Sequence, residues 1–101
     1  MNKKKSKHLE LLRNENDSLL AFLKAKFPMF HKSNFFFRDL QYGIRRFFEK
    51  KDITIGYTEA DDLAKIIAGD LETKGIFIKV NNNGWTLNHP EFVTVEPGDP
   101  F

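Results

Sequence analysis

The chain has no cysteine, four prolines, six glycines and no long apolar run. Without cysteine it has no disulfide, no thiolate nucleophile and no Cys-type zinc site, which fits a reducing compartment. No stretch approaches the roughly eighteen apolar residues of a membrane span. The basic start, residues 1–7, is followed by Glu10, Arg13, Glu15 and Asp17, which interrupt the apolar stretch of an export signal. We therefore expect a cytoplasmic protein with no membrane partner.

The residues that enzymes and metal sites use are sparse. His8, His31 and His89 are scattered and lack the spacings of a metal-binding helix. Asp61 and Asp62 are adjacent, so on a helix their side chains diverge by about 100°, which is poor geometry for an acid/base pair or a metal. The six glycines form no phosphate-binding loop. We therefore expect no catalytic residue, no metal, no cofactor and no enzymatic activity.

A strong charge asymmetry lies behind the net charge of +2. Residues 1–51 hold 13 Lys and Arg against 5 Asp and Glu, or +8, and residues 52–101 hold 3 against 9, or −6. The basic half favours a polyanion as partner, and the acidic half favours a basic surface. The same split would let two copies associate head to tail as a homodimer. A solvated surface with a lysine-rich terminus is the simplest alternative for the basic half.

Length and composition predict a single domain with short tails. At 101 residues, with 41% hydrophobic residues and eleven Phe, the chain has enough apolar material for one core. The first seven residues are basic and lack apolar periodicity, so we expect a flexible tail there. Residues 8–96 form the predicted domain. Residues 97–101, with two prolines and a glycine, form its C-terminal tail.

Two helices are expected in the basic half. The first spans residues 8–27, where the polar run 14–18 interrupts the apolar face. The second is capped by Ser33 or Asn34 and ends near Lys51. Its arginines lie outward, and its inward positions are large and apolar. These inward residues are Phe37, Leu40, Ile44, Phe47 and Phe48.

A third helix is expected in the acidic half. Thr58 caps it, Gly75 ends it, and its inward positions repeat at helical spacing. These inward residues are Ala60, Leu63, Ala64, Ile67 and Leu71. Gly69, inside the helix, predicts close packing against another backbone. The runs 53–55 and 92–95 are expected to be short strands.

A β-hairpin is expected directly after the third helix. With Asn83 and Gly84 as a two-residue type I′ turn, Gly84 has a positive φ and Val80 faces Leu87. One face of the hairpin then carries its apolar side chains and buries Trp85 against the third helix. These side chains are Ile76, Ile78, Val80, Trp85 and Leu87.

Residues 61–88, DDLAKIIAGDLETKGIFIKVNNNGWTLN, resemble the winged-helix superfamily. In that superfamily the helix before the wing ends in Leu-x-x-x-Gly, and the wing's second strand often finishes in an aromatic followed by Thr-Leu. Leu71, Gly75 and residues 85–87 match this pattern. The resemblance implies an α+β fold, a three-helix winged-helix-like domain with a C-terminal β-hairpin wing, whose third helix is the recognition helix. It implies either DNA binding in transcription regulation or a protein-binding adaptor.

DNA or RNA is the first interpretation of the partner, and it depends on basic residues in three places. The expected contacts are Lys3, Lys4, Lys5 and Lys7 in the tail, Arg38, Arg45 and Arg46 on the second helix, and Lys79 on the outer face of the wing. The recognition helix is acidic, however, because residues 57–74 hold two lysines against five acids. The alternative is a protein-binding adaptor whose third helix meets a basic protein surface. Its contacts would be Glu59, Asp61, Asp62, Lys65 and Asp70.

The run Phe35-Phe36-Phe37 suggests a stacking platform for single-stranded nucleic acid. As consecutive helical residues, however, these side chains would point in different directions, so no more than one or two could be exposed together. Core packing is therefore the preferred explanation of this run.

Overall fold

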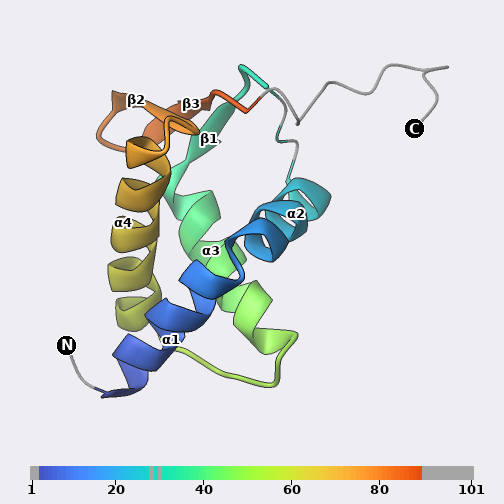
Figure 1. The fold of residues 1–101 in the computed structure, drawn as a ribbon, viewed down its shortest axis with the longest axis vertical. Helices are drawn as coiled ribbons and strands as arrows, with labels where there is room; N and C mark the ends of the chain where they lie inside the picture. Colours follow the sequence, from blue (N-terminus) through green and yellow to red (C-terminus); the bar gives the residue numbers. More distant parts are fainter. Residues whose placement is uncertain (1–2, 28, 30, 90–101) are drawn as a thin grey trace, which may run out of the picture.

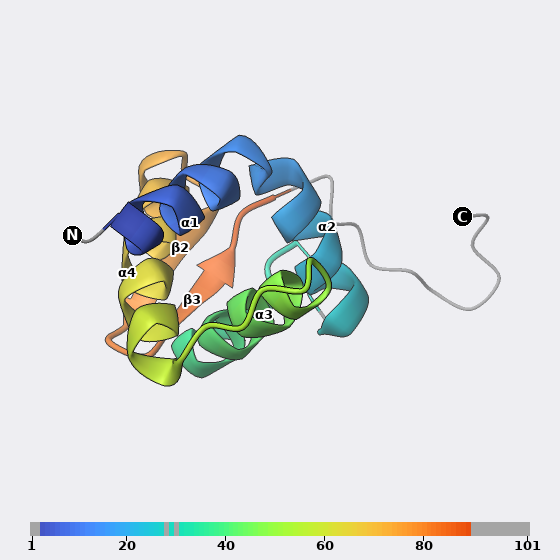
Figure 2. The same ribbon diagram turned by 90° about the horizontal axis from the view of Figure 1, so that it is seen from below.

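The computed structural model describes residues 3–27, 29 and 31–89, which form four helices and a three-stranded antiparallel sheet. In chain order these elements are α1 (Lys3–Asn14), α2 (Asn16–Lys26), β1 (Asn34–Phe36), α3 (Phe37–Glu49), α4 (Tyr57–Thr73), β2 (Phe77–Asn81) and β3 (Gly84–Leu87). Figure 1 shows the sheet at one end of α4, and Figure 2 shows α1 and α3 on opposite sides of the molecule. The expected α+β class is confirmed.

The expected first helix is two helices. α1 begins at Lys3, so the segment before His8 is helical and not the separate tail that its composition predicts. The chain bends at 14–16, within the polar run that interrupts the apolar pattern. Because of this bend, Leu12 of α1 and Leu23 of α2 both reach the core and are fully buried.

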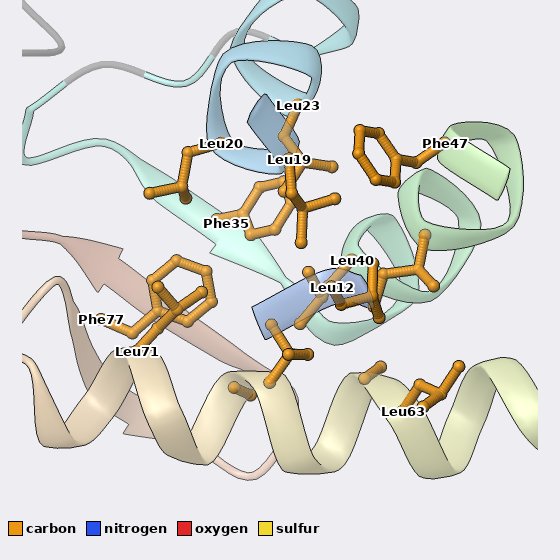
Figure 3. Close-up of a cluster of buried hydrophobic side chains, with 14 of the residues drawn as sticks. Leu12, Leu19, Leu20, Leu23, Phe35, Leu40, Phe47, Leu63, Leu71 and Phe77 are labelled. Atoms are coloured by element: carbon orange, nitrogen blue, oxygen red, sulfur yellow. The ribbon is translucent and has the colours of Figure 1, made fainter. Parts of the chain in front are cut away.

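The core lies between the helices and one face of the sheet (Figure 3). The inward positions expected on α3 and α4 are buried, except Phe37, which is half-buried. Phe35 of β1 and Phe77 of β2 join the sheet to this core, with ring centroids 5.8 Å apart. Each fully buried Leu or Phe stabilises the fold by about 1.5–3 kcal/mol relative to exposure.

The third strand is not at residues 53–55, which form no strand. It is β1, where the start of a helix was expected. Phe35 lies opposite Trp85, so the strand order is β1-β3-β2. Successive strand residues point to opposite faces, so Phe35 is buried and Phe36 is exposed. The expected strand at 92–95 lies outside the described residues, as does the tail at 97–101.

The hairpin forms with a different turn from the expected one. Asn82 and Asn83 are the two turn residues, and Gly84 is already in β3. Neither these asparagines nor Gly84 has a positive φ, so the predicted type I′ turn is wrong. The backbone N–H of Asn83 instead donates a 2.8 Å hydrogen bond to the side-chain oxygen of Asn81, and such local Asn bonds stabilise tight turns.

The different register reverses the faces of β2. Lys79 lies opposite Trp85, a pairing that is displaced by an odd number of residues from the expected one. Such a displacement moves every side chain of a strand to the other face. Ile78 and Val80 are therefore 51% and 60% exposed, whereas Phe77 is buried. The expected apolar face holds only in part: Trp85 is buried as predicted, but not beside Ile78 and Val80.

The surroundings of three glycines show where elements pack closely and where they do not. A Cβ added at Gly43 of α3 would lie 2.2 Å from Cδ2 of Leu23, so α2 and α3 pack closely there. At Gly84 it would lie 3.1 Å from the carbonyl oxygen of Phe35, so this glycine serves the approach of β1 and not the turn. Gly69 has no atom within 4 Å of an added Cβ, and the close packing predicted there is wrong.

Candidate functional site

The arginines of α3 lie on its outward side, and two of them contact aromatic rings. The guanidinium carbon of Arg45 is 4.0 Å from the ring centroid of Tyr57, the first residue of α4, and its Nε donates to the carbonyl oxygen of Ile55 at 3.4 Å. Arg46 lies 5.2 Å from the ring of Tyr42 and donates a 2.9 Å hydrogen bond to its hydroxyl. A cation held by a ring keeps its full charge.

Arg46 has an acid partner and the other two arginines have none. Its Nη1 lies 2.9 Å from Oε2 of Glu49. The hydrogen bonds to Tyr42 and then to Glu49 raise the pKa of Arg46, although a guanidinium is charged at physiological pH in any case. Within the described part of the chain, no acid pairs with Arg38 or Arg45. Of the three arginines of α3, those two are therefore the ones available to an anionic ligand.

Two adjoining hollows run along this side of α3. One has a volume of about 360 Å³ and is lined by Phe36, Phe37, Arg38, Gln41 and Asn83. The other has a volume of about 210 Å³ and is lined by Arg38, Gln41, Tyr42, Arg45 and Tyr57. Because they share Arg38 and Gln41, they form one continuous depression, here called the arginine groove. No acidic residue lines it within the described chain.

The arginine groove continues toward the wing. A hollow of about 380 Å³ between α4 and the hairpin shares Phe37 with the groove and is also lined by Lys65, Glu72, Lys79 and Trp85. The indole N–H of Trp85 donates to a carboxylate oxygen of Glu72 at 3.1 Å. Because Lys79 lies opposite Trp85 in the hairpin, the two side chains are on the same face. The expected position of Lys79 on the outer wing face is therefore wrong.

The N-terminal lysines at 3–7 belong to α1, which lies on the opposite side of the molecule from α3 (Figure 2). α1 is attached to α4 at two points: Nδ1 of His8 contacts the carboxylate of Glu59, and Nε of Arg13 lies 2.8 Å from Oδ2 of Asp70. The hydrogen bond to Asp70 raises the pKa of Arg13. The structure therefore does not bring the lysine segment together with the arginine groove.

Three of the five acids of α4 contact basic groups within the chain. Glu59 and Asp70 contact α1. Oδ2 of Asp61 lies 2.9 Å from Nζ of Lys65, one turn further along α4. The hydrogen bond and charge of Asp61, with the charge of Asp62, raise the pKa of Lys65. Their negative charge is thus partly balanced inside the fold, which weakens the argument that α4 repels a polyanion.

The aromatic lining of the groove is not evident from the sequence. Phe36, Tyr42 and Tyr57 are 49%, 46% and 70% exposed, so the core packing expected for the run 35–37 does not hold for Phe36. The spacing Arg38-x-x-x-Tyr42-x-x-x-Arg46 is a visible helical signal, since residues four apart share a face. Tyr57 carries no such signal, because only the packing of α4 on α3 brings it to Arg45.

A second basic hollow lies between α2 and the end of α3. Its volume is about 580 Å³, and Phe22, Phe47, Lys50 and Lys51 contribute to its lining. Lys51 pairs with Glu15 at 2.8 Å, and Lys50 lies 5.3 Å from the ring of Phe22. The hollow shares no lining residue with the arginine groove.

Comparisons with protein-family models, with curated proteins and with solved structures find no match for this chain. Among the described residues, no group of three or more His, Cys, Asp or Glu is placed to hold a metal ion. No helix in the same part of the chain is long and apolar enough to cross a membrane. The arginine groove with the hollow beside the wing, and the separate basic hollow between α2 and α3, are the features that these residues offer to a ligand. The first of these brings together site residues predicted on α3 and on the wing.

Proposed function

We propose that this chain is a non-enzymatic domain of the winged-helix kind that binds nucleic acid through the arginine groove and the adjoining wing. The observation that carries the proposal is the connected surface on which Arg38, Arg45 and Lys79 lie with no acid paired to them among the described residues. Lys and Arg contacts to phosphates supply most of the non-specific affinity for nucleic acid. The planar guanidinium fork also matches phosphate geometry.

Two observations support a winged-helix kind of domain. α4 is followed directly by a hairpin, the order implied by the resemblance, and Gly75, with φ of +77°, ends the helix. Trp85 of β3 packs over α4 by way of Glu72. The resemblance makes α4 the recognition helix, but the cations that line the connected hollows without an acid partner among the described residues are Arg38 and Arg45 of α3 and Lys79 of β2. We therefore assign the phosphate contacts to the arginine groove and Lys79 instead of to α4.

The test is a fluorescence-anisotropy titration of mixed-sequence duplex and single-stranded oligonucleotides at two salt concentrations. The double variant Arg38→Gln with Arg45→Gln should bind more weakly and with a flatter salt dependence. Each lost phosphate contact removes about 0.9 from the log-log salt slope on duplex DNA and about 0.7 on a single strand. Arg13→Gln is the matched control for each single variant, Arg38→Gln and Arg45→Gln, because it also removes one cation, but from the α1 side, where Asp70 already pairs with it.

Two results would contradict the proposal. One is the absence of binding to either oligonucleotide at the lower salt concentration. The other is an equal loss of slope in the Arg13→Gln control, since binding would then depend on net charge and not on the arginine groove. In the first case a protein partner for α4 becomes the better interpretation, and Asp61→Asn with Asp62→Asn should then weaken the binding of a basic protein.

A further inference from the structure

Three large aromatic side chains stand in solvent along the arginine groove. Phe36, Tyr42 and Tyr57 are each close to half exposed or more. Of the described residues, the only other large apolar side chains exposed to this degree are Ile78 and Val80 on β2. Exposed aromatic surface gathered on one face of a small domain marks a binding surface, because the same side chains would stabilise the fold if they were buried in its core.

Each of these rings has a cation beside it. Arg45 lies against the ring of Tyr57, and Arg38 lines the hollow beside Phe36. Arg46 lies against the ring of Tyr42, although it is paired with Glu49 and lines neither hollow. Arg38 and Arg45 are two helical turns apart, or roughly 10 Å along α3. Aromatic rings beside phosphate-binding cations are typical of surfaces that bind unpaired strands, in which bases stack on rings while the backbone contacts the cations.

We propose that the nucleic acid bound by the arginine groove is a single strand whose unpaired bases stack on Tyr57, Tyr42 and Phe36. This inference rests on the proposed function and specifies its ligand. A duplex keeps its bases stacked on each other, so it would contact the arginines and leave the three rings without a partner. Of the described residues of α4, only Tyr57 lines the groove, and the acids of α4 do not line it, so a strand in the groove contacts α4 at its aromatic first residue.

A protein partner is the competing explanation, since Tyr and Arg are enriched at protein interfaces. The lining of the groove favours nucleic acid: it holds two arginines and no acid among the described residues, and its polar groups include Gln41 and Asn83. Amide side chains donate and accept hydrogen bonds, as the edges of unpaired bases require.

The experiment compares a labelled mixed-sequence single strand with the duplex of the same sequence, for the intact chain and for Tyr57→Ala. Tyr57 is the best site because its ring is 70% exposed, so its removal leaves the core intact. We expect single-strand affinity to fall roughly 5- to 150-fold, the factor for one lost base stack. The salt slope should stay unchanged, because Arg45 keeps its charge and its hydrogen bond to the carbonyl oxygen of Ile55 when the ring is lost. Duplex affinity should fall much less than single-strand affinity, because no base stack is lost from it.

Two control variants separate stacking from unspecific effects. Tyr57→Phe keeps an aromatic face and should bind the single strand almost as the intact chain does. Ile78→Ala removes an apolar side chain of similar exposure on the opposite face of the hairpin from Lys79 and should leave binding unchanged. Circular dichroism of each variant establishes that it folds.

The outcomes distinguish this inference from the proposed function. Equal affinity of Tyr57→Ala and the intact chain for the single strand, with duplex binding retained, overturns the single-strand inference and leaves nucleic-acid binding standing. A similar loss for single strand and duplex also overturns it, because base stacking is then not the cause. No binding of either oligonucleotide overturns both the inference and the proposed function.

Discussion

The α1 and α3 sides of the molecule carry basic residues with opposite roles. On the α1 side, His8 and Arg13 contact Glu59 and Asp70 of α4, so their partners lie within the fold. On the α3 side, Arg45 lies on the ring of Tyr57 and has no acid partner in the described chain. A cation paired with an acid attaches one element to another, whereas a cation on a ring is oriented and still charged. The position of a basic residue thus matters more than the net charge of its half of the chain.

The largest effect expected from this comparison concerns the α1 side. Leu12→Ala should lower the free energy of unfolding by about 2–5 kcal/mol, because Leu12 is fully buried and its removal leaves a cavity. Urea denaturation followed by circular dichroism measures it. Arg38→Ala, on the exposed α3 side, should change the same quantity by less than about 0.5 kcal/mol. Similar values for the two variants would mean that α1 is not an integral part of the fold.

The next effect compares the inner side of α3 with the outer side of α4 through the same substitution. Gly43→Ala should destabilise by about 1–2 kcal/mol, because the added methyl meets buried Leu23 and the resulting strain exceeds the gain in helix propensity. Gly69→Ala should stabilise by roughly 0.5–1 kcal/mol, since nothing lies near the added Cβ. Thermal unfolding of both variants checks the opposite signs. A stabilising Gly43→Ala would contradict the close approach of α2 and α3.

The smallest effect concerns the attachment of α1 to α4. A double-mutant cycle of Arg13→Ala and Asp70→Ala should give a coupling free energy of about 0.2–1 kcal/mol, because the Arg13 side chain is 51% exposed and solvent screens the pair. The coupling should shrink at high salt. A coupling of several kcal/mol, unchanged by salt, would show that this side is held by a desolvated pair.

The helices follow from the sequence better than the sheet does. The inward positions of α4 are predicted correctly because apolar residues repeat at helical spacing over its whole length. The register of the hairpin is not predicted correctly. The turn lies one residue earlier than expected, and the pairing shifts again between Lys79 and Asn81, which brings the other face of β2 to the core. The sequence does not indicate this irregularity, because β2 offers an apolar residue to either face. The close approach of β1 to Gly84, a tertiary contact, accompanies the observed register.

The candidate site is predictable to the same extent. Arg38, Arg45 and Arg46 are expected outward on α3 from their spacing, and the structure has them there. The proximity of Tyr57 to Arg45 depends on the crossing of α3 and α4, and the exposure of Phe36 depends on β1 being a strand. β1 has three residues, and its Phe residues continue into the first residue of α3, so the sequence shows no alternating pattern long enough to predict a strand there.

β1 also constrains the order in which the molecule can fold. Asn34 and Thr86, which lie opposite each other in the sheet, are 52 positions apart, so a long loop must close before the sheet can pair. Helix contacts are local and should form earlier. The backbone N–H of Phe37, at the start of α3, donates to the carbonyl oxygen of Asn83 in the wing turn at 2.8 Å. We therefore expect the wall of the arginine groove formed by Phe36 and Asn83 to be among the last parts to assemble, and a peptide of α3 alone to carry the arginines without the groove.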